Sequence, residues 1–162
     1  MTTNTYSSTV YHSSEEIPIE LRERPQWVLW RLEPGADGRL TKRPYQLNGA
    51  LASSTNPATW ATFDRVCDRP RTAEAGIGFV FAPDDGLVGV DLDGCRNPET
   101  GELDEWARDI IADLTSYTEV SASGSGVHII VKGTLPSNVN RKLTGLPNRY
   151  GKQPGVEIYD RG

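Results

Sequence analysis

Four residues with side chains suited to metal or acid–base chemistry each lie inside a short apolar run of the sequence. Asp91 and Asp93 lie in the run 86–94, His128 in the run 127–132, and Glu157 in the run 155–160. Runs of this length and β-branched content predict strands. Because successive side chains of a strand alternate between its faces, Asp91 and Asp93 point to the same side. Two carboxylates there repel each other and lose hydration, a cost that a hard divalent cation offsets by binding oxygen ligands.

A sheet that joins these three strands would gather three carboxylates and one histidine on one face. Converging carboxylates can hold two divalent ions, which lower the pKa of an attacking hydroxyl and stabilise charge on a phosphoryl group. The turn Ser123–Gly126 precedes His128 and offers backbone N–H groups that approach a phosphate closely. The set favours a nucleoside triphosphate and a nucleic acid over small-molecule hydrolysis. The alternative is a strand end with solvated acids, since charged residues are usually surface features.

Basic residues that could meet a polyanion fall into two tracts. They are Lys42 and Arg43 in the first, and Arg141, Lys142, Arg149 and Lys152 in the second. The second tract lies in a loop-like segment, 133–154, that contains no acidic residue. Contact with DNA phosphates is one interpretation. The other is a solvated loop for the second tract and protection of an exposed sheet edge for the first.

Length and composition indicate one soluble globular domain. The chain has 162 residues, a net charge of −5 and two cysteines, Cys67 and Cys95. The charge excludes a protein that coats DNA passively, although a local basic patch can still bind it. Two cysteines indicate neither a disulfide framework nor a zinc site, and no apolar run spans a membrane, so a cytoplasmic location is expected. Residues 1–14 are expected to form a flexible leader, and 15–162 the domain.

The elements that would position these residues alternate between hairpins and helices. Strands are predicted at 26–33, 42–46, 76–82, 86–94, 117–121, 127–132 and 155–160, and helices at 14–25, 57–68 and 102–114. Asn56 or Thr55 is expected to cap the helix 57–68. The turn Pro83–Gly86 predicts that strands 76–82 and 86–94 form an antiparallel hairpin. The fold class is therefore α/β in the α+β sense, with mostly antiparallel pairing.

The order of a D-x-D strand, a small-x-His strand and an apolar-Glu strand resembles the archaeo-eukaryotic primase superfamily. More narrowly, it resembles the primase-polymerase domain at the N-terminus of phage and plasmid replication proteins. The matching segments are 89–94, 121–130 and 156–161, with 27–30, 42–45 and 52–60 upstream. The resemblance therefore covers most of residues 25–162.

This resemblance implies an RRM-like catalytic antiparallel sheet with flanking helices, packed with an N-terminal α/β unit. It implies a DNA primase/DNA polymerase, a template-dependent nucleotidyltransferase that acts on a DNA template and nucleoside triphosphates, with a fused or associated helicase. Asp91, Asp93 and Glu157 would hold two Mg²⁺ or Mn²⁺ ions, and Asp91, Asp93, His128 and Glu157 would form the catalytic set. Ser123, Ser125, His128 and Lys132 would contact the incoming nucleotide.

Two features depart from the family pattern. Position 125 is Ser where many relatives have Lys or Arg, so the phosphate charge must be met elsewhere, by Lys132, Arg141 or Arg149. Relatives also continue beyond the third motif with another strand and a helicase part. The chain is therefore expected to be an N-terminal portion of a longer protein.

Two other functions compete with this interpretation. Val90–Gly94 also matches the opening motif of haloacid-dehalogenase-type phosphohydrolases, in which Asp91 would be the nucleophile and Asp93 the acid/base. That family places the motif on its first strand and needs a later acidic pair, which this chain lacks. The second competitor is a nucleic-acid-binding replication module that keeps the fold without activity.

Overall fold

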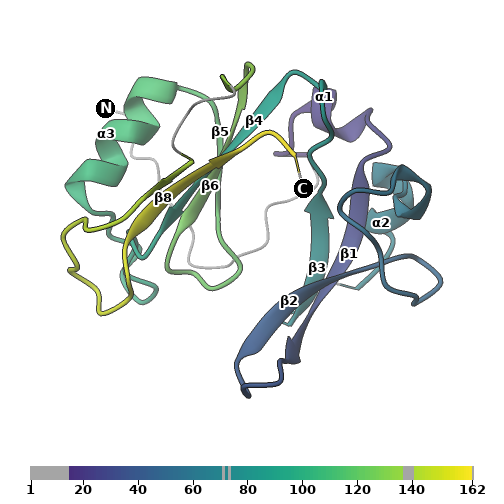
Figure 1. Ribbon diagram of the computed structural model, residues 1–162, viewed down its shortest axis with the longest axis horizontal. Helices are drawn as coiled ribbons and strands as arrows, with labels where there is room; N and C mark the ends of the chain where they lie inside the picture. Colours follow the sequence, from purple (N-terminus) through teal and green to yellow (C-terminus); the bar gives the residue numbers. More distant parts are fainter. Residues whose placement is uncertain (1–14, 71, 73, 137–140, 162) are drawn as a thin grey trace. The chain divides into compact units, whose positions relative to one another are not determined.

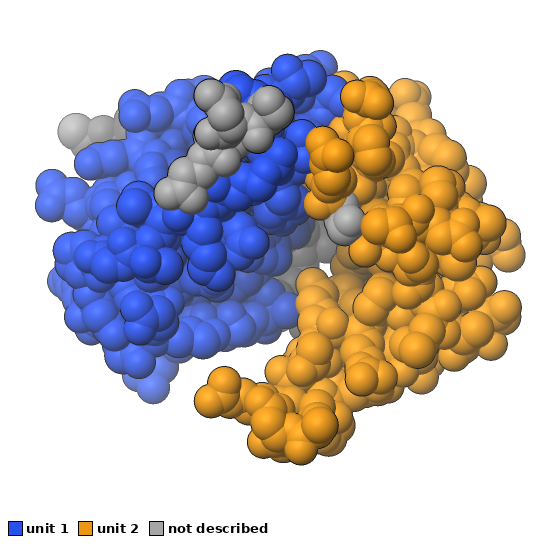
Figure 2. Space-filling model, in the orientation of Figure 1, with its two compact units in different colours: residues 1–12, 86–160 blue, residues 13–85, 161–162 orange. Residues whose placement is uncertain are grey.

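The computed structural model describes residues 15–70, 72, 74–136 and 141–161, and these form two compact units (Figures 1 and 2). One unit contains the described residues of 86–160, and the other contains those of 15–85 together with residue 161. The leader expected at 1–14 lies outside the described residues. Eight strands in two antiparallel sheets and three short α-helices occur in the described part, which confirms the α+β class.

The unit that contains residues 15–85 is built on a three-stranded sheet in the order β2-β1-β3. The strands are β1 (Trp27–Pro34), β2 (Leu40–Tyr45) and β3 (Ala75–Phe79). The central strand β1 carries the buried Trp27, whose ring packs edge-on against Phe63 and Phe79 at centroid distances of 4.9 and 5.3 Å. The predicted edge strand is confirmed as β2. Pro44 lacks a backbone N–H, and this is tolerated because β2 has no second neighbouring strand that would need the hydrogen bond.

The single helix predicted for 57–68 is wrong, because the segment divides into two pieces. A 3₁₀ turn, η1 (Pro57–Thr59), is followed by α2 (Phe63–Cys67). Between them Ala61 exchanges two backbone hydrogen bonds with Trp27, of 2.7 and 3.1 Å, which draws the chain out of helical geometry. Of the two predicted caps, Asn56 is confirmed for η1, since its side chain accepts from the Ala58 N–H at 3.1 Å. The helix predicted for 14–25 is the four-residue α1 (Ile19–Arg22).

The predicted hairpin between 76–82 and 86–94 is also wrong. β3 pairs with β1, whereas β4 (Leu87–Asp93) belongs to the second sheet and pairs with β6 (Val127–Lys132) and β8 (Gly155–Tyr159). The turn itself exists, and Asp84 and Gly86 both adopt positive φ there, of 63° and 73°. Turn residues fix a reversal of the chain locally, but strand partners are chosen by burial and by non-local pairing. This turn therefore connects two sheets.

The unit that contains residues 86–160 is a five-stranded sheet in the order β5-β6-β4-β8-β7. Its strands are β4, β5 (Tyr117–Val120), β6 (Val127–Lys132), β7 (Lys142–Leu143) and β8 (Gly155–Tyr159). The two-residue β7 lies in the segment expected to be a loop.

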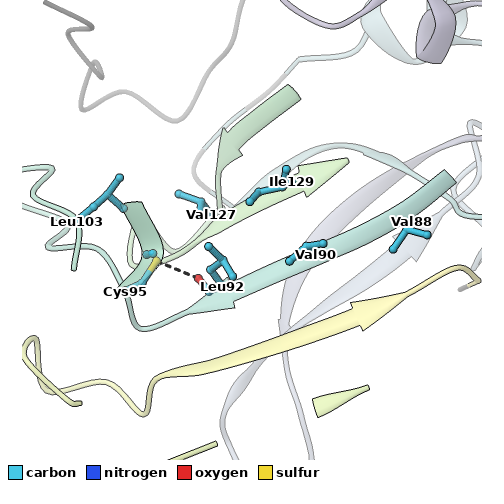
Figure 3. Packing of buried hydrophobic residues seen from close by; sticks show 8 residues of the cluster. Val88, Val90, Leu92, Cys95, Leu103, Val127 and Ile129 are labelled. Carbon is cyan, nitrogen blue, oxygen red and sulfur yellow. Dashed lines mark hydrogen bonds between the residues drawn. The ribbon is translucent and has the colours of Figure 1, made fainter. Parts of the chain in front are cut away.

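One face of this sheet forms the core of its unit. Val88, Val90 and Leu92 of β4 pack with Val127 and Ile129 of β6 (Figure 3). The helix α3 (Glu105–Leu114) covers this face through Ala107, Trp106, Ile110 and Ile111 (Figure 1). Because α3 covers this one face, the alternate side chains of the strands remain available for chemistry. In the described part of the chain, no helix has the length and apolar content needed to cross a membrane.

Candidate active site

A row of five ionisable side chains crosses the sheet face opposite the core. Directly paired residues of an antiparallel ladder share a face, so the register identifies the row. Asp91 of β4 pairs with His128 of β6 and Glu157 of β8, His128 pairs with Glu119 of β5, and Glu157 pairs with Lys142 of β7. Asp93, two residues beyond Asp91 on the same face, is exposed at the end of β4. The three expected strands therefore bring the predicted acids and histidine together.

Glu119 belongs to this row but was not identified from the sequence. Its carboxylate Oε1 lies 3.3 Å from His128 Nδ1, and its Oε2 accepts a hydrogen bond of 2.8 Å from the Tyr117 hydroxyl. On the other side of the ring, His128 Nε2 lies 3.6 Å from Asp91 Oδ1. Each ring nitrogen thus faces a carboxylate, which fixes the imidazole plane across the sheet. The pattern Tyr-Thr-Glu-Val, with one acid on an alternating strand, was the available signal.

Tyr159 of β8 lies near the carboxylates of this sheet face. Tyr159 pairs with Gly89, two residues before Asp91. Burial raises the pKa of its phenol well above the usual range, and the charges of Asp91, Glu119, Glu157 and Asp93 raise it further. Concentrated negative charge of this kind is what a bound divalent cation neutralises.

The predicted metal ligands of this sheet face fit a divalent ion by chemistry, but their positions in the structure do not close around one. Asp91, Asp93 and Glu157 supply carboxylate oxygens, the ligands that Mg²⁺ and Mn²⁺ prefer. Among the residues that the structure describes, no three His, Cys, Asp or Glu side chains are grouped closely enough to hold an ion. Glu157 instead contacts Lys142, with Nζ 3.4 Å from Oε2. Metal binding would therefore require Glu157 to exchange this lysine for the ion.

A turn rich in serine lies where β4 ends and β6 begins. The hydroxyls of Ser121, Ser123 and Ser125 form a chain with oxygen–oxygen distances of 3.1 and 2.8 Å. The turn packs tightly on β4, because a Cβ added at Gly126 would lie 2.5 Å from the carbonyl oxygen of Leu92. Only glycine permits this approach, which holds Ser123 and Ser125 at the same end of β4 as Asp93.

The predicted phosphate contact Lys132 is not brought to this turn. It ends β6 opposite Leu87, at the far end of the strand from the turn. Five residues of strand separate it from Val127, a distance of about 16 Å. Lys132 therefore lies away from Ser123 and Ser125.

Most of the predicted DNA-contacting residues have acidic partners in the structure. Arg141 pairs with Asp160 at 3.1 Å, Arg149 with Glu102 at 2.9 Å, and Arg43 with Glu33 at 3.9 Å. Lys42 lies over the Trp30 ring, 4.5 Å from its centroid, and Lys152 donates to the Ser125 hydroxyl. The acids come from other elements, which the acid-free sequence of 133–154 does not reveal. Contact with DNA stays a prediction for these residues.

Three neighbouring strands of one antiparallel sheet thus carry the site. One has two acids, one has His128 directly after the serine turn, and one has Glu157. Comparison with known proteins bears on this combination. No protein-family model matches the sequence. The chain is 36% identical over 151 residues to a curated relative, and the match covers 91% of this chain.

Over most of its length the chain is therefore homologous to a primase-polymerase, a replication protein of the archaeo-eukaryotic primase type. The relative that shows this is the DNA primase-polymerase of Nitratiruptor phage NrS-1. The chain spans about a fifth of the length of that relative, since the match covers 20% of it.

Proposed function

We propose that this chain is a template-dependent nucleotidyltransferase domain that primes and extends DNA from nucleoside triphosphates. The observation that carries the proposal is the pairing of Asp91 with both His128 and Glu157 in a chain homologous to a primase-polymerase. The five-stranded sheet would be the RRM-like catalytic sheet of the family. Residues 15–85 would form its N-terminal α/β unit, and 15–162 the primase-polymerase domain of a longer replication protein with a fused or associated helicase.

Each polar group of the sheet face has a role in this proposal. Asp91, Asp93 and Glu157 would hold two Mg²⁺ or Mn²⁺ ions, which activate the primer hydroxyl and stabilise charge at the reacting phosphate. His128, whose Nδ1 faces Glu119, would donate a hydrogen bond from Nε2 to a phosphate oxygen, since its 3.6 Å separation from Asp91 is longer than a hydrogen bond. The hydroxyls and backbone N–H groups of the serine turn would bind the remaining phosphate oxygens. The proposed DNA contacts are Lys42, Arg43, Arg141, Arg149 and Lys142, of which Lys142 also lies in the row.

The test is template-dependent synthesis by the 162-residue chain with Mg²⁺ or Mn²⁺, compared with its Asp91→Asn variant. Asparagine keeps the size of the side chain but removes the charge that attracts the ions. We expect product formation to fall about 100- to 1,000-fold, the effect typical of losing one group that stabilises a transition state. Asp109→Asn, an exposed acid on α3, is the matched control and should retain the activity of the unaltered chain.

Each other outcome of this experiment favours a different function. Template binding without synthesis by the unaltered chain would favour a replication module that has no activity. Phosphate release from a phosphomonoester without polymer formation would favour a phosphohydrolase. Synthesis that survives Asp91→Asn would remove the proposed metal role of the row.

A further inference from the structure

The side chain of Lys152 lies on the serine turn. Its Nζ donates a hydrogen bond of 2.7 Å to the Ser125 hydroxyl, although the two residues come from different loops. Ser125 is buried, with 8% of its surface exposed, whereas Lys152 is exposed. An ammonium group has three donors, and Ser125 accepts one of them. The remaining donors are therefore available at the surface of the turn.

The backbone of Lys152 is held in place at the end of β4. A Cβ added at Gly94 would lie 2.8 Å from the Lys152 carbonyl oxygen, so the loop approaches this glycine as closely as a backbone can. Pro154 is fully buried, and Gly155 pairs with Asp93 at the start of β8. Because β6 and β8 both run antiparallel to β4, the segments that precede them meet at the same end of the sheet. The sequence of 133–154 alone does not show that Lys152 reaches the turn.

A second cation lies beneath the turn. The Arg96 guanidinium is buried, with 3% of the residue exposed, and its Nη1 donates to the Gly124 carbonyl at 2.8 Å. The backbone N–H of Arg96 also donates to the Ser125 carbonyl at 3.1 Å. Arginine stays charged when it is buried, so its field acts on whatever binds above the turn. The turn is thus contacted by one buried and one exposed positive charge.

Lys152 also differs from the other cations of its loop. Arg141, Lys142 and Arg149 each contact a carboxylate, whereas Lys152 donates to a neutral hydroxyl. Its charge is therefore not neutralised by that partner. Within the described residues, this combination of hydroxyls, backbone donors and two cations fits a polyphosphate better than a single carboxylate.

We propose that Lys152 binds the triphosphate of the incoming nucleotide and that Ser125 positions it for this role. This assignment rests on the proposed function and moves Lys152 from the predicted DNA contacts to the nucleotide site. A serine at position 125 cannot itself neutralise the phosphate charge. Ser125 instead binds the ammonium group of Lys152, which comes from another loop and supplies the positive charge. Lys132, Arg141 and Arg149 are then not needed for this purpose.

The test is calorimetric binding of inorganic tripolyphosphate, and of a non-hydrolysable deoxynucleoside triphosphate, to the 162-residue chain with Mg²⁺ and without DNA. Lys152→Ala should raise both dissociation constants about tenfold, the effect of losing one charge-assisted hydrogen bond. The control Arg39→Ala removes an exposed positive charge from the hairpin loop between β1 and β2, and should leave both constants unchanged. Circular dichroism and thermal unfolding would show that both variants fold.

A second variant separates the charge from the loop that carries it. Adding Ser125→Lys to Lys152→Ala places an ammonium group directly on the turn, and should restore most of the lost triphosphate affinity. A role for Lys152 in packing alone predicts no recovery in this double variant.

Three results would overturn the proposal. The first is that the unaltered chain does not bind tripolyphosphate, and the second is that Lys152→Ala leaves its dissociation constant unchanged. The third is unchanged triphosphate binding with weaker single-stranded DNA binding and a shallower salt dependence, which would return Lys152 to the DNA contacts. Absence of template-directed synthesis with normal triphosphate binding would instead reject the proposed function and leave the role of Lys152 standing.

Discussion

The two faces of β4 differ in composition although their residues alternate along one strand. Val88, Val90 and Leu92 lie on the face toward α3, and Gly89, Asp91 and Asp93 lie on the other. The first face is a buried apolar cluster, and the second meets His128 and Glu157 of the neighbouring strands. Neighbouring residues of one strand thus have separate tasks, since one set stabilises the sheet and the next forms the candidate site.

This separation means that stability and activity should respond to different substitutions at adjacent positions. A residue on the core face loses packing when it is shortened, which lowers the free energy of unfolding. An acid on the open face contributes little to stability, because exposed ion pairs are weak and like charges repel. The comparison therefore predicts variants that lose stability alone and variants that lose activity alone.

The largest expected effect is on the core face. Leu92 is fully buried, so Leu92→Ala should lower the free energy of unfolding by about 3 kcal/mol in urea denaturation. Leu143→Ala is the matched control, since Leu143 continues the same row across Val156 but is 53% exposed, and should cost less than about 1 kcal/mol. Asp91→Asn should also cost less than about 1 kcal/mol. A loss for Asp91→Asn equal to that for Leu92→Ala would contradict the separation of the two faces.

The next effect concerns the serine turn between β5 and β6, which packs on the end of β4. Gly126→Ala places a Cβ 2.5 Å from the Leu92 carbonyl oxygen, so the turn must move, at a cost of about 1–3 kcal/mol in unfolding. Gly133→Ala meets no atom within 4 Å and serves as the control, with little change or a slight gain. Triphosphate affinity should fall with Gly126→Ala, because Ser123 and Ser125 move with the turn. Equal stability of the two variants would show that the close approach is unimportant.

A smaller effect is expected at Glu119, which contacts His128 and is not one of the proposed metal ligands. Glu119→Gln should lower kcat about tenfold while the KM for nucleotide and the stability change little, because the ring loses its charged partner but remains on the sheet. Glu119→Ala should lower kcat further. The control is Glu99→Gln, an exposed acid in the loop before α3. A change in KM alone would assign Glu119 to substrate binding instead of orientation.

The smallest expected effect is a difference between the two cysteines in their rate of alkylation. Cys95 extends the core face, donates its thiol to the Leu92 carbonyl at 3.2 Å and is fully buried. Burial raises the pKa of this thiol to about 12, so little of the reactive thiolate exists at pH 7 to 9. Cys67 is only half-buried and should react with iodoacetamide first in the native chain, as followed by mass spectrometry. Equally fast labelling of Cys95 would show that the core face opens readily.

The sequence predicted the strands of the site well because their apolar runs are short, β-branched and bounded by turns. It placed β6 at its observed bounds, and it gave the acids of β4 a common side. The sequence did not predict contacts between residues that are far apart in the chain. No local pattern indicates that β3 pairs with β1 or that Ala61 forms a β-bridge with Trp27. Glu119 and the contact of Lys152 with Ser125 were missed for the same reason. Each depends on which strands become neighbours.

The strand order has a consequence for how the site comes into being during folding. β4 lies at the centre of its sheet, but its two partners follow it late in the chain, and β8 comes last. Pairings between segments so far apart have a high contact order and close slowly, because the intervening chain must first lose entropy. During synthesis on the ribosome, Asp91 and Asp93 emerge well before Glu157. The proposed metal-binding acids are therefore complete only after residue 157 has been made, so that a partly made chain carries Asp91 and Asp93 without Glu157.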